Sequence, residues 1–198
     1  RLIALFSKTS HMDYDLDRQN NPASTQPSLS EMTSKAIDLL SKNQDGYFLM
    51  VEGGRIDHAL HGTNAKRALQ DASAFDDAIK TALSKVDLSN TLIVVTADHD
   101  HTMTINGYSA KGNNVLDLVK EGSNKTIKRD VNGNAITTLA FGNGPNRKQV
   151  REDLTSEQVM ADNYLQESGV KLGSETHGGG DVMLFAKGPN ADLFKGTI

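Results

Sequence analysis

Residues 46–61 read GYFLMVEGGRIDHALH, and this stretch decides how the chain is expected to fold. Residues 46–51 are a short apolar run with aromatic and β-branched side chains, which predicts a buried strand. Glu52 stands at the carboxyl end of that strand, and a Gly-Gly pair ends it. Asp57 and His61 follow four residues apart, so they share one face of a helical turn. A carboxylate and an imidazole directed together just past a strand end suit a divalent metal.

Apolar periodicity predicts further strands and helices on both sides of this stretch. Ser28 and Glu31 fit a capping box at the start of one helix. The run at residues 92–96 is apolar throughout, as expected of a parallel strand covered on both faces. The predicted elements are strands at residues 2–6, 92–96 and 182–186 and helices at residues 28–43 and 64–85. We therefore expect an α/β fold, in which an open and mostly parallel central sheet has helices on both faces.

Residues 102–174 are less regular and are expected to form an accessory insertion on the sheet. Residues 126–130 and 135–141 flank the turn sequence VNGN, which indicates a hairpin. Thr155 and Gln158 fit a second capping box, which predicts a short helix.

Residues 11–21 (HMDYDLDRQNN) are polar and are predicted to form a solvated loop. Asp13, Asp15 and Asp17 alternate with bulky residues, which is one feature of a cation-binding loop. The stretch lacks the Gly and the closing Glu of an EF-hand, so the solvated loop is favoured.

The composition limits the class of protein. A chain of 198 residues with 37% hydrophobic and 23% charged residues is expected to be globular with one sizeable core. The net charge is −4 without a Lys/Arg-rich block, which gives no support to nucleic-acid binding. No apolar run reaches the length of a membrane span, and no signal peptide is visible. The chain begins with Arg1 rather than Met, so we expect a piece of a longer protein.

Histidines carry the strongest chemical signal in the sequence. The chain has six histidines and no Cys, and five of the six lie in or near acidic or Gly-rich clusters: His58, His61, His99, His101 and His177. Imidazoles beside carboxylates at strand ends are typical of zinc ligands, and the lack of Cys excludes a zinc finger. Two such clusters could hold two metals for in-line displacement at phosphorus. The alternative interpretation is ordinary: helix-start, strand-end and turn residues that bind no metal.

Three motifs then occur in order: VEGGRIDHALH, TADHDH and ETHGGGD, the last followed by a strand that ends in KGP. Together they resemble the C-terminal half of alkaline phosphatase, and the resemblance covers most of the chain. It implies one magnesium and two zinc ions. The residues that match are Glu52 for magnesium, Asp57, His61 and His177 for the first zinc, and Asp98 and His99 for the second zinc. Two further histidines match candidate catalytic positions: His101 beside the metal ligands, and His58 near the metals and the substrate phosphate.

The resemblance also implies a function and partners. It implies hydrolysis of phosphate monoesters through a phosphoseryl intermediate, with inorganic phosphate as product, a homodimer, and a periplasmic or secreted enzyme. It places the serine nucleophile and the phosphate-binding arginine in an upstream N-terminal segment of the same enzyme, and no Asp-Ser-Ala motif occurs here. We therefore expect residues 1–198 to be the C-terminal part of a single α/β domain, incomplete as an enzyme.

Two alternatives to this function remain open. Another superfamily hydrolase, namely a phosphodiesterase, a sulfatase or a phosphomutase, would share the metal ligands but differ in nucleophile and substrate pocket. An inactive metal-binding fragment is the second alternative.

Overall fold

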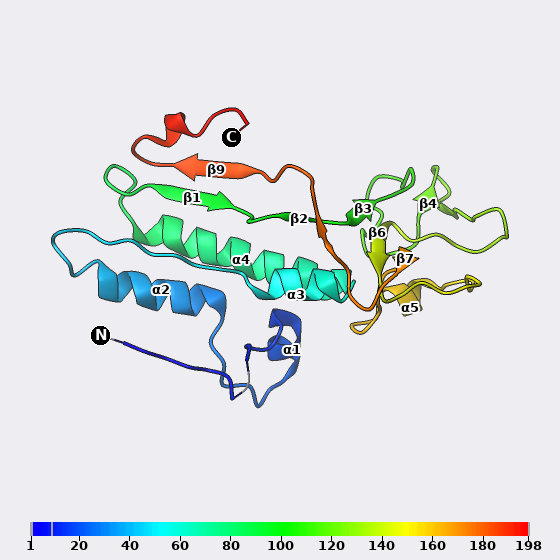
Figure 1. Cartoon of the computed structure of the whole chain (residues 1–198), viewed down its shortest axis with the longest axis horizontal. Coiled ribbons are helices and arrows are strands. Elements are labelled where there is room, and N and C mark those ends of the chain that lie inside the picture. The colour runs from blue at the N-terminus through cyan, green and yellow to red at the C-terminus, as the bar shows by residue number, and fades with distance from the viewer. Residues whose placement is uncertain (1, 9, 198) are drawn as a thin grey trace. The chain divides into compact units, whose positions relative to one another are not determined.

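The computed structural model describes residues 2–8 and 10–197, and the chain divides into two compact units (Figure 1). The first unit comprises Arg1–Arg55, Gln70–His99 and Asp181–Ile198. The second unit comprises Ile56–Leu69 and Asp100–Gly180. The predicted accessory insertion at residues 102–174 falls within the second unit, while its role as an insertion in a single domain stays a prediction.

The first unit contains three helices, one two-stranded ladder and a short 3-10 helix. Its elements are α1 (Asp15–Asn20), α2 (Leu29–Leu40), most of α4 (Ala65–Lys85), β1 (Ile93–Thr96), β9 (Leu184–Lys187) and η1 (Ala191–Leu193). Strands β1 and β9 pair antiparallel. Helices α2 and α4 are joined at two places, by the Ser30–Thr81 hydroxyl contact of 2.6 Å and the Asp38–Lys85 ion pair of 2.7 Å.

The second unit contains short strands around a small apolar core. Its elements are most of α3 (Arg55–His61), the first turn of α4, β2 (Asp100–His101), β3 (Met103–Ile105), β4 (Lys120–Glu121), β5 (Thr126–Ile127), β6 (Leu139–Gly144), α5 (Ser156–Val159), β7 (Ser168–Lys171) and β8 (His177–Gly178). Leu118, Ala135 and Val159 form the buried core cluster. Strands β3, β6 and β7 form one sheet in that order, while β2 pairs with β8 and β4 with β5.

The predicted α/β class and the main helices are confirmed. The Ser28 hydroxyl accepts the Glu31 N–H at 3.2 Å and the Glu31 carboxylate accepts the Ser28 N–H at 2.8 Å, so the first capping box begins α2. Thr155 and Gln158 form the second capping box, which begins α5. Asn64 accepts the Arg67 N–H at 2.9 Å and so caps α4, close to its predicted start.

The predicted hairpin around VNGN is confirmed as a tight turn with a single antiparallel bridge. Arg129 bridges Ala135, and Gly133 takes the left-handed conformation with φ of 85° that the turn requires. The flanking strands find other partners, since β5 pairs with β4 and β6 with β3 and β7.

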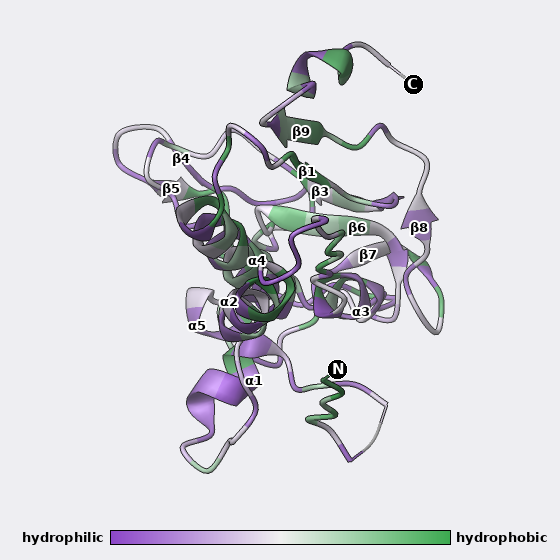
Figure 2. Ribbon diagram, turned by 90° about the vertical axis from the view of Figure 1, so that its left-hand side faces the viewer, coloured by the Kyte–Doolittle hydropathy of each residue, from purple (hydrophilic) through white to green (hydrophobic). Residues whose placement is uncertain are grey.

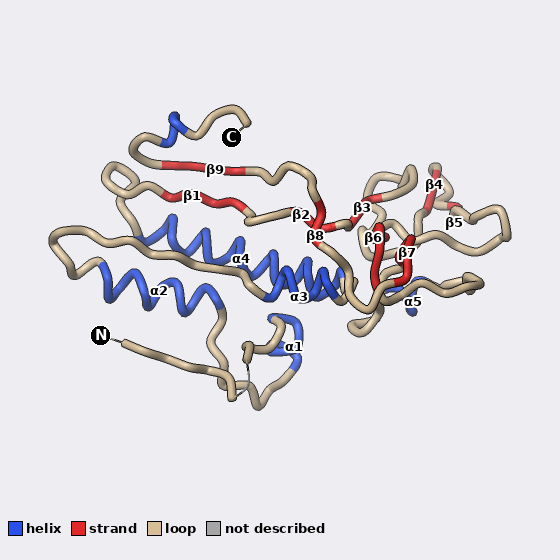
Figure 3. Tube along the Cα trace, in the orientation of Figure 1, coloured by secondary structure: helices blue, strands red, loops and turns tan. Residues whose placement is uncertain are grey.

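The expected parallel sheet is present only in small part. Within residues 2–8 and 10–197, β6 and β7 form the parallel ladder and the other four ladders are antiparallel. Residues 2–6 and 46–51, both predicted as strands, have no ladder partner among the described residues and run as extended loop (Figure 3). Those two predictions are wrong for this structure, because an apolar pattern identifies a segment able to form a strand but not the neighbour that must pair with it.

The same two segments expose large apolar side chains. Ile3 and Leu5 are 89% and 90% exposed, and Phe48 is 89% exposed. Figure 2 shows the hydrophobic colouring of the N-terminal segment. Of the described helices, none combines the length and the apolar character needed to cross a bilayer.

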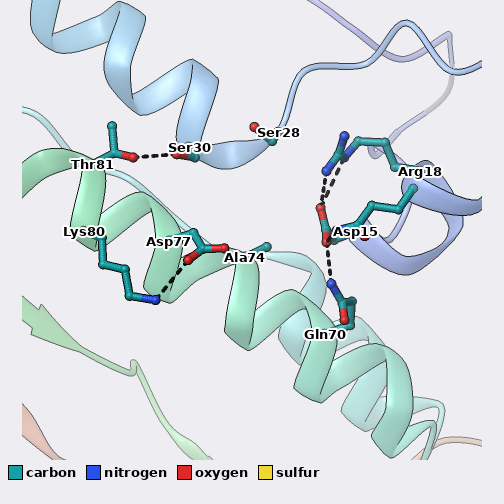
Figure 4. Close-up of a pocket in the computed structure, with 10 residues that line it drawn as sticks. Asp15, Arg18, Ser28, Ser30, Gln70, Ala74, Asp77, Lys80 and Thr81 are labelled. Carbon is teal, nitrogen blue, oxygen red and sulfur yellow. Dashed lines mark hydrogen bonds and ion pairs between the residues drawn. The ribbon is translucent and has the colours of Figure 1, made fainter.

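The predicted solvated loop at residues 11–21 is wrong over part of its length, because residues 15–20 form helix α1. The Asp15 side chain is buried and accepts hydrogen bonds from Arg18 at 2.6 Å and from Gln70 of α4 at 2.9 Å (Figure 4). These charges line a cavity of about 380 Å³. Asp15 thus serves a long-range contact with α4, which no local pattern reveals.

Asp71 of α4 lies against the same helix start. Its two carboxylate oxygens are each 3.3 Å from the Asp15 N–H that donates to them. The pKa of the Asp71 carboxyl is raised from 3.8 to about 6, chiefly by burial. The Asp15 N–H bond opposes this rise, and the nearby Asp15 charge contributes to it.

This raised pKa predicts a pH-dependent stability. The folded protein holds a proton on Asp71 that the unfolded chain has lost, so the associated stability is present below pH 3.8 and is lost as pH rises through about 6. We expect Asp71→Asn to be more stable than the parent at pH 7.5 by about 1 kcal/mol, after allowance for screening of a half-exposed group, and equal to it near pH 4. Urea unfolding at both pH values measures the difference.

The control is Asp76→Asn, an exposed substitution on the same helix. It is expected to shift the free energy of unfolding by less than about 0.5 kcal/mol at either pH. An unchanged pH slope in Asp71→Asn contradicts the prediction.

Candidate metal centre

Helix α3 presents two of the predicted zinc ligands from one face. Asp57 and His61 are separated by one helical turn, and the Asp57 Oδ1 atom lies 3.3 Å from the His61 Nε2 atom. The helix is short, and its last residue is tied to the chain before β8, because the Glu175 N–H donates to the His61 carbonyl at 2.9 Å. The two ligands are therefore fixed both by helical spacing and by a long-range backbone bond.

The short ladder between β2 and β8 brings in the third predicted ligand. His101 pairs directly with His177, and Asp100 with Gly178, so the two histidines stand side by side. The glycines allow this close approach. A Cβ atom on Gly178 would lie 2.7 Å from the His101 carbonyl oxygen, and one on Gly180 would lie 2.5 Å from the Asp100 carboxylate. The Gly-rich run after His177 thus has a steric cause.

The ligand atoms of Asp57, His61 and His177 form a nearly equilateral triangle. The His61 Nε2 atom is 3.1 Å from the His177 Nε2 atom, and the Asp57 Oδ1 atom is 3.3 Å and 3.4 Å from these two nitrogens. In a tetrahedral zinc site with bonds of about 2.0–2.1 Å, neighbouring ligand atoms are about 3.3–3.4 Å apart. The triangle therefore has the size of one face of such a tetrahedron.

The orientation of the His61 ring also fits a metal ligand. Its Nδ1 atom lies 2.6 Å from the Glu175 carbonyl oxygen, which can only accept a hydrogen bond, so Nδ1 carries the proton. The Nε2 atom of the same ring faces Asp57 Oδ1 and His177 Nε2. A hydrogen bond from the second ring nitrogen to a carbonyl or carboxylate is the usual support of a metal-bound histidine.

His101 lies behind this triangle. Its side chain is only 7% exposed, whereas those of Asp57, His61 and His177 are 34%, 30% and 50% exposed. The Nε2 atom of His101 lies 3.0 Å from Asp57 Oδ1, and its Nδ1 atom lies 2.7 Å from the Glu175 carboxylate. This placement agrees with a residue that supports a ligand from the buried side.

The remaining predicted site residues are not members of this triangle. Glu52, Asp98 and His99 belong to the first unit, where His99 Nε2 is 3.4 Å from Asp98 Oδ2. The magnesium ligand and the second zinc pair therefore stay predictions. His58 follows Asp57 on α3 and is half-buried, and a neighbouring helix position points about 100° away from the Asp57 face.

Two residues that sequence reasoning did not assign are part of the cluster. Glu175 contacts His61 and His101, and Thr102 donates to the Glu175 carboxylate. The sequence spacing could have identified Glu175. It precedes His177 by two residues, and residues two apart in an extended segment lie on the same side.

The α/β fold and the clustered Asp and His ligand atoms define the class, an α/β protein whose clustered side chains could hold a metal ion. The particular family follows from comparison. A sequence model of alkaline phosphatase matches residues 1–198, and the chain belongs to the alkaline phosphatase family.

Similar proteins agree with this family. The tissue-nonspecific isozyme of alkaline phosphatase from Homo sapiens is 44% identical over 99% of this chain, and a membrane-bound alkaline phosphatase from Bombyx mori is 40% identical over 98%. The chain spans 36% and 34% of the lengths of these two relatives. A solved TAB5 alkaline phosphatase variant with Mg bound in its M3 site shares the fold, with a TM-score of 0.52 and 24% identity over 95% of this chain and 46% of that one.

The triangle predicts that the 198-residue chain binds zinc. We expect close to one equivalent or more to survive dialysis, as measured by elemental analysis. His177→Ala should weaken zinc binding by more than the roughly 10–100-fold that loss of an outer hydrogen-bond partner costs, because it removes one of three protein ligands. The matched control is His11→Ala, at an exposed histidine outside the triangle. A clean protein that takes up no zinc, or equal effects of the two substitutions, contradicts the assignment.

Proposed function

We propose that this 198-residue chain is the zinc-binding part of a phosphomonoesterase. The whole enzyme holds two zinc ions and one magnesium ion. The observation that carries the proposal is the Asp57–His61–His177 triangle, whose three ligand atoms leave a fourth position open for water or phosphate. Family membership supports the reaction class. Because the chain spans little more than a third of the relatives, the reaction is proposed for the whole enzyme that contains it.

Zinc in this position would act as a Lewis acid on a phosphoryl oxygen and lower the pKa of a bound hydroxyl. The chain's own residues supply the geometry. Asp57, His61 and His177 would bind the ion through one oxygen and two nitrogens. The Glu175 carbonyl keeps the His61 ring oriented, and His101 holds Asp57 from the buried side. A fixed ligand set of this kind costs little reorganisation when charge develops on phosphate.

The other ligands are proposed on the family pattern. Glu52 is proposed for magnesium, Asp98 and His99 for the second zinc, and His58 for a position near the substrate phosphate. The nucleophilic serine and the phosphate-binding arginine are proposed to come from another segment of the same enzyme. Phosphate monoesters as substrates, a homodimer, and a secreted or periplasmic location are likewise proposals. The relatives named above come from animals, so they add no support for the periplasm in particular.

A graft tests the reaction. The human tissue-nonspecific isozyme, which is 44% identical over 199 residues, offers a matching segment that this chain can replace. We expect the chimera to hydrolyse p-nitrophenyl phosphate at alkaline pH in a zinc-dependent manner. His61→Ala in the graft should lower turnover on the order of 10²-fold or more, because the triangle loses a ligand. The negative control is the human isozyme from which the segment replaced in the chimera has been deleted.

Parallel assays decide between the alternatives. Preference for bis-p-nitrophenyl phosphate or p-nitrophenyl sulfate would favour a phosphodiesterase or a sulfatase, and a folded, zinc-loaded chimera without turnover would favour a metal-binding fragment. The 198-residue chain alone, loaded with zinc and magnesium, should stay below enzymatic rates, because proximity to a positioned nucleophile contributes about 7–11 kcal/mol at best. Turnover near about one per second by the chain alone would reveal a nucleophile within it.

A further inference from the structure

Glu175 is a fully buried carboxylate whose oxygens are both occupied. Its side chain is 0% exposed. The Oε1 atom accepts the Thr102 N–H at 2.6 Å and the Thr102 hydroxyl at 2.7 Å, while Oε2 accepts from His101 Nδ1 at 2.7 Å. A buried charge is tolerated when it is paired and hydrogen-bonded in this way. Burying a carboxylate costs desolvation free energy. The three donors that offset this cost all lie at His101 and Thr102, at the end of β2.

The contacts of Glu175 reach two of the three triangle residues. Its main chain holds His61 twice, through the N–H to the His61 carbonyl at 2.9 Å and through its own carbonyl to the His61 Nδ1 atom at 2.6 Å. Its side chain holds His101, which in turn contacts Asp57 Oδ1 at 3.0 Å. The third member, His177, follows Glu175 by two residues in the chain.

The Glu175 side chain also lies close to the backbone of Gly144. Gly144 adopts a φ of 146°, and a Cβ atom there would lie 2.5 Å from the Thr63 side chain and 3.5 Å from the Glu175 Cβ atom. A side chain at position 144 would therefore collide with Thr63, next to Glu175.

A direct metal ligand is the competing role for Glu175, since its carboxylate lies within 4.8 Å of the His61 and His101 ligand atoms. The geometry disfavours that role. Both oxygens already accept hydrogen bonds, and the side chain has no exposed surface, whereas the triangle residues are 30–50% exposed. A residue enclosed on all sides acts through its neighbours.

We propose that Glu175 is the positioning residue of the metal centre: its carboxylate accepts the His101 Nδ1–H and so orients the ring, and the Nε2–H on the other side of the ring donates to Asp57 and fixes the Asp57 oxygen in the triangle. The proposal deepens the proposed function and rests on its zinc site. It concerns two quantities: the zinc affinity of the chain, and the protonation of the His101 Nδ1 atom. Both can be measured without enzymatic turnover.

The test uses the 198-residue chain, with zinc as the probe. Glu175→Ala removes the acceptor of His101 and should raise the zinc Kd about 10–100-fold, measured by competition with a chelator. Glu175→Asp retains a carboxylate and should recover part of this loss. In ¹⁵N spectra of the histidine rings, the His101 Nδ1 atom should carry a proton in the parent. In Glu175→Gln, which preserves the side-chain volume, that proton should be lost, because the amide N–H₂ faces the ring.

The matched control is Glu167→Gln, which removes a carboxylate from a partly buried ion pair with Arg151 in the same unit. It should lower stability while zinc affinity and the His101 spectrum stay as in the parent.

Should the Glu175 variants not fold, Thr102→Val offers a second test. It removes the hydroxyl donor to Oε1 and keeps the Glu175 charge, and it should weaken zinc binding several-fold. Parent-like zinc affinity in the folded Glu175 variants, or in Thr102→Val, overturns the proposal, as does a His101 ring unchanged in Glu175→Gln. An inactive graft with these effects intact would instead count against the phosphatase assignment alone.

Discussion

The ladder between β2 and β8, closed by the buried carboxylate of Glu175, is the constraint on which the metal centre depends. It is only two residue pairs long, yet it sets His101 opposite His177 and brings Glu175 to the end of helix α3. Segments that are far apart in sequence thereby converge within one compact unit. Because an isolated ladder of this length contributes little stability, the charged hydrogen bonds of Glu175 and the close glycine packing must hold it.

This arrangement separates exposed ligand residues from buried residues that hold them in place. The triangle residues keep part of their surface exposed, as ligands that leave room for an incoming oxygen must. The supporting residues, His101 and Glu175, lie in the interior, where a low dielectric strengthens their hydrogen bonds. The Gly-rich run does not serve flexibility here. Gly178 and Gly180 permit the backbone to approach β2 at a distance that a side chain would prevent.

Local rules predicted much of the fold and part of the site. Capping boxes at Ser28 and Thr155 located two helices, since a cap acts within one turn. The spacing of Asp57 and His61 placed both on one helical face for the same reason. Features that depend on distant partners were predicted wrongly. The strand predicted at residues 46–51 has no ladder partner among the described residues, and helix α1, predicted as loop, depends on Asp15 meeting α4. Glu175 escaped notice because its burial arises only when β8 meets β2.

X-ray absorption at the zinc edge, on the 198-residue chain carrying one zinc per chain, tests the central claim most directly. The account predicts two imidazole nitrogens and one carboxylate oxygen at about 2.0–2.1 Å, with one imidazole lost in His177→Ala and both retained in His101→Asn. A shell with three imidazoles that loses one in His101→Asn would contradict the account, because His101 would then bind the metal itself.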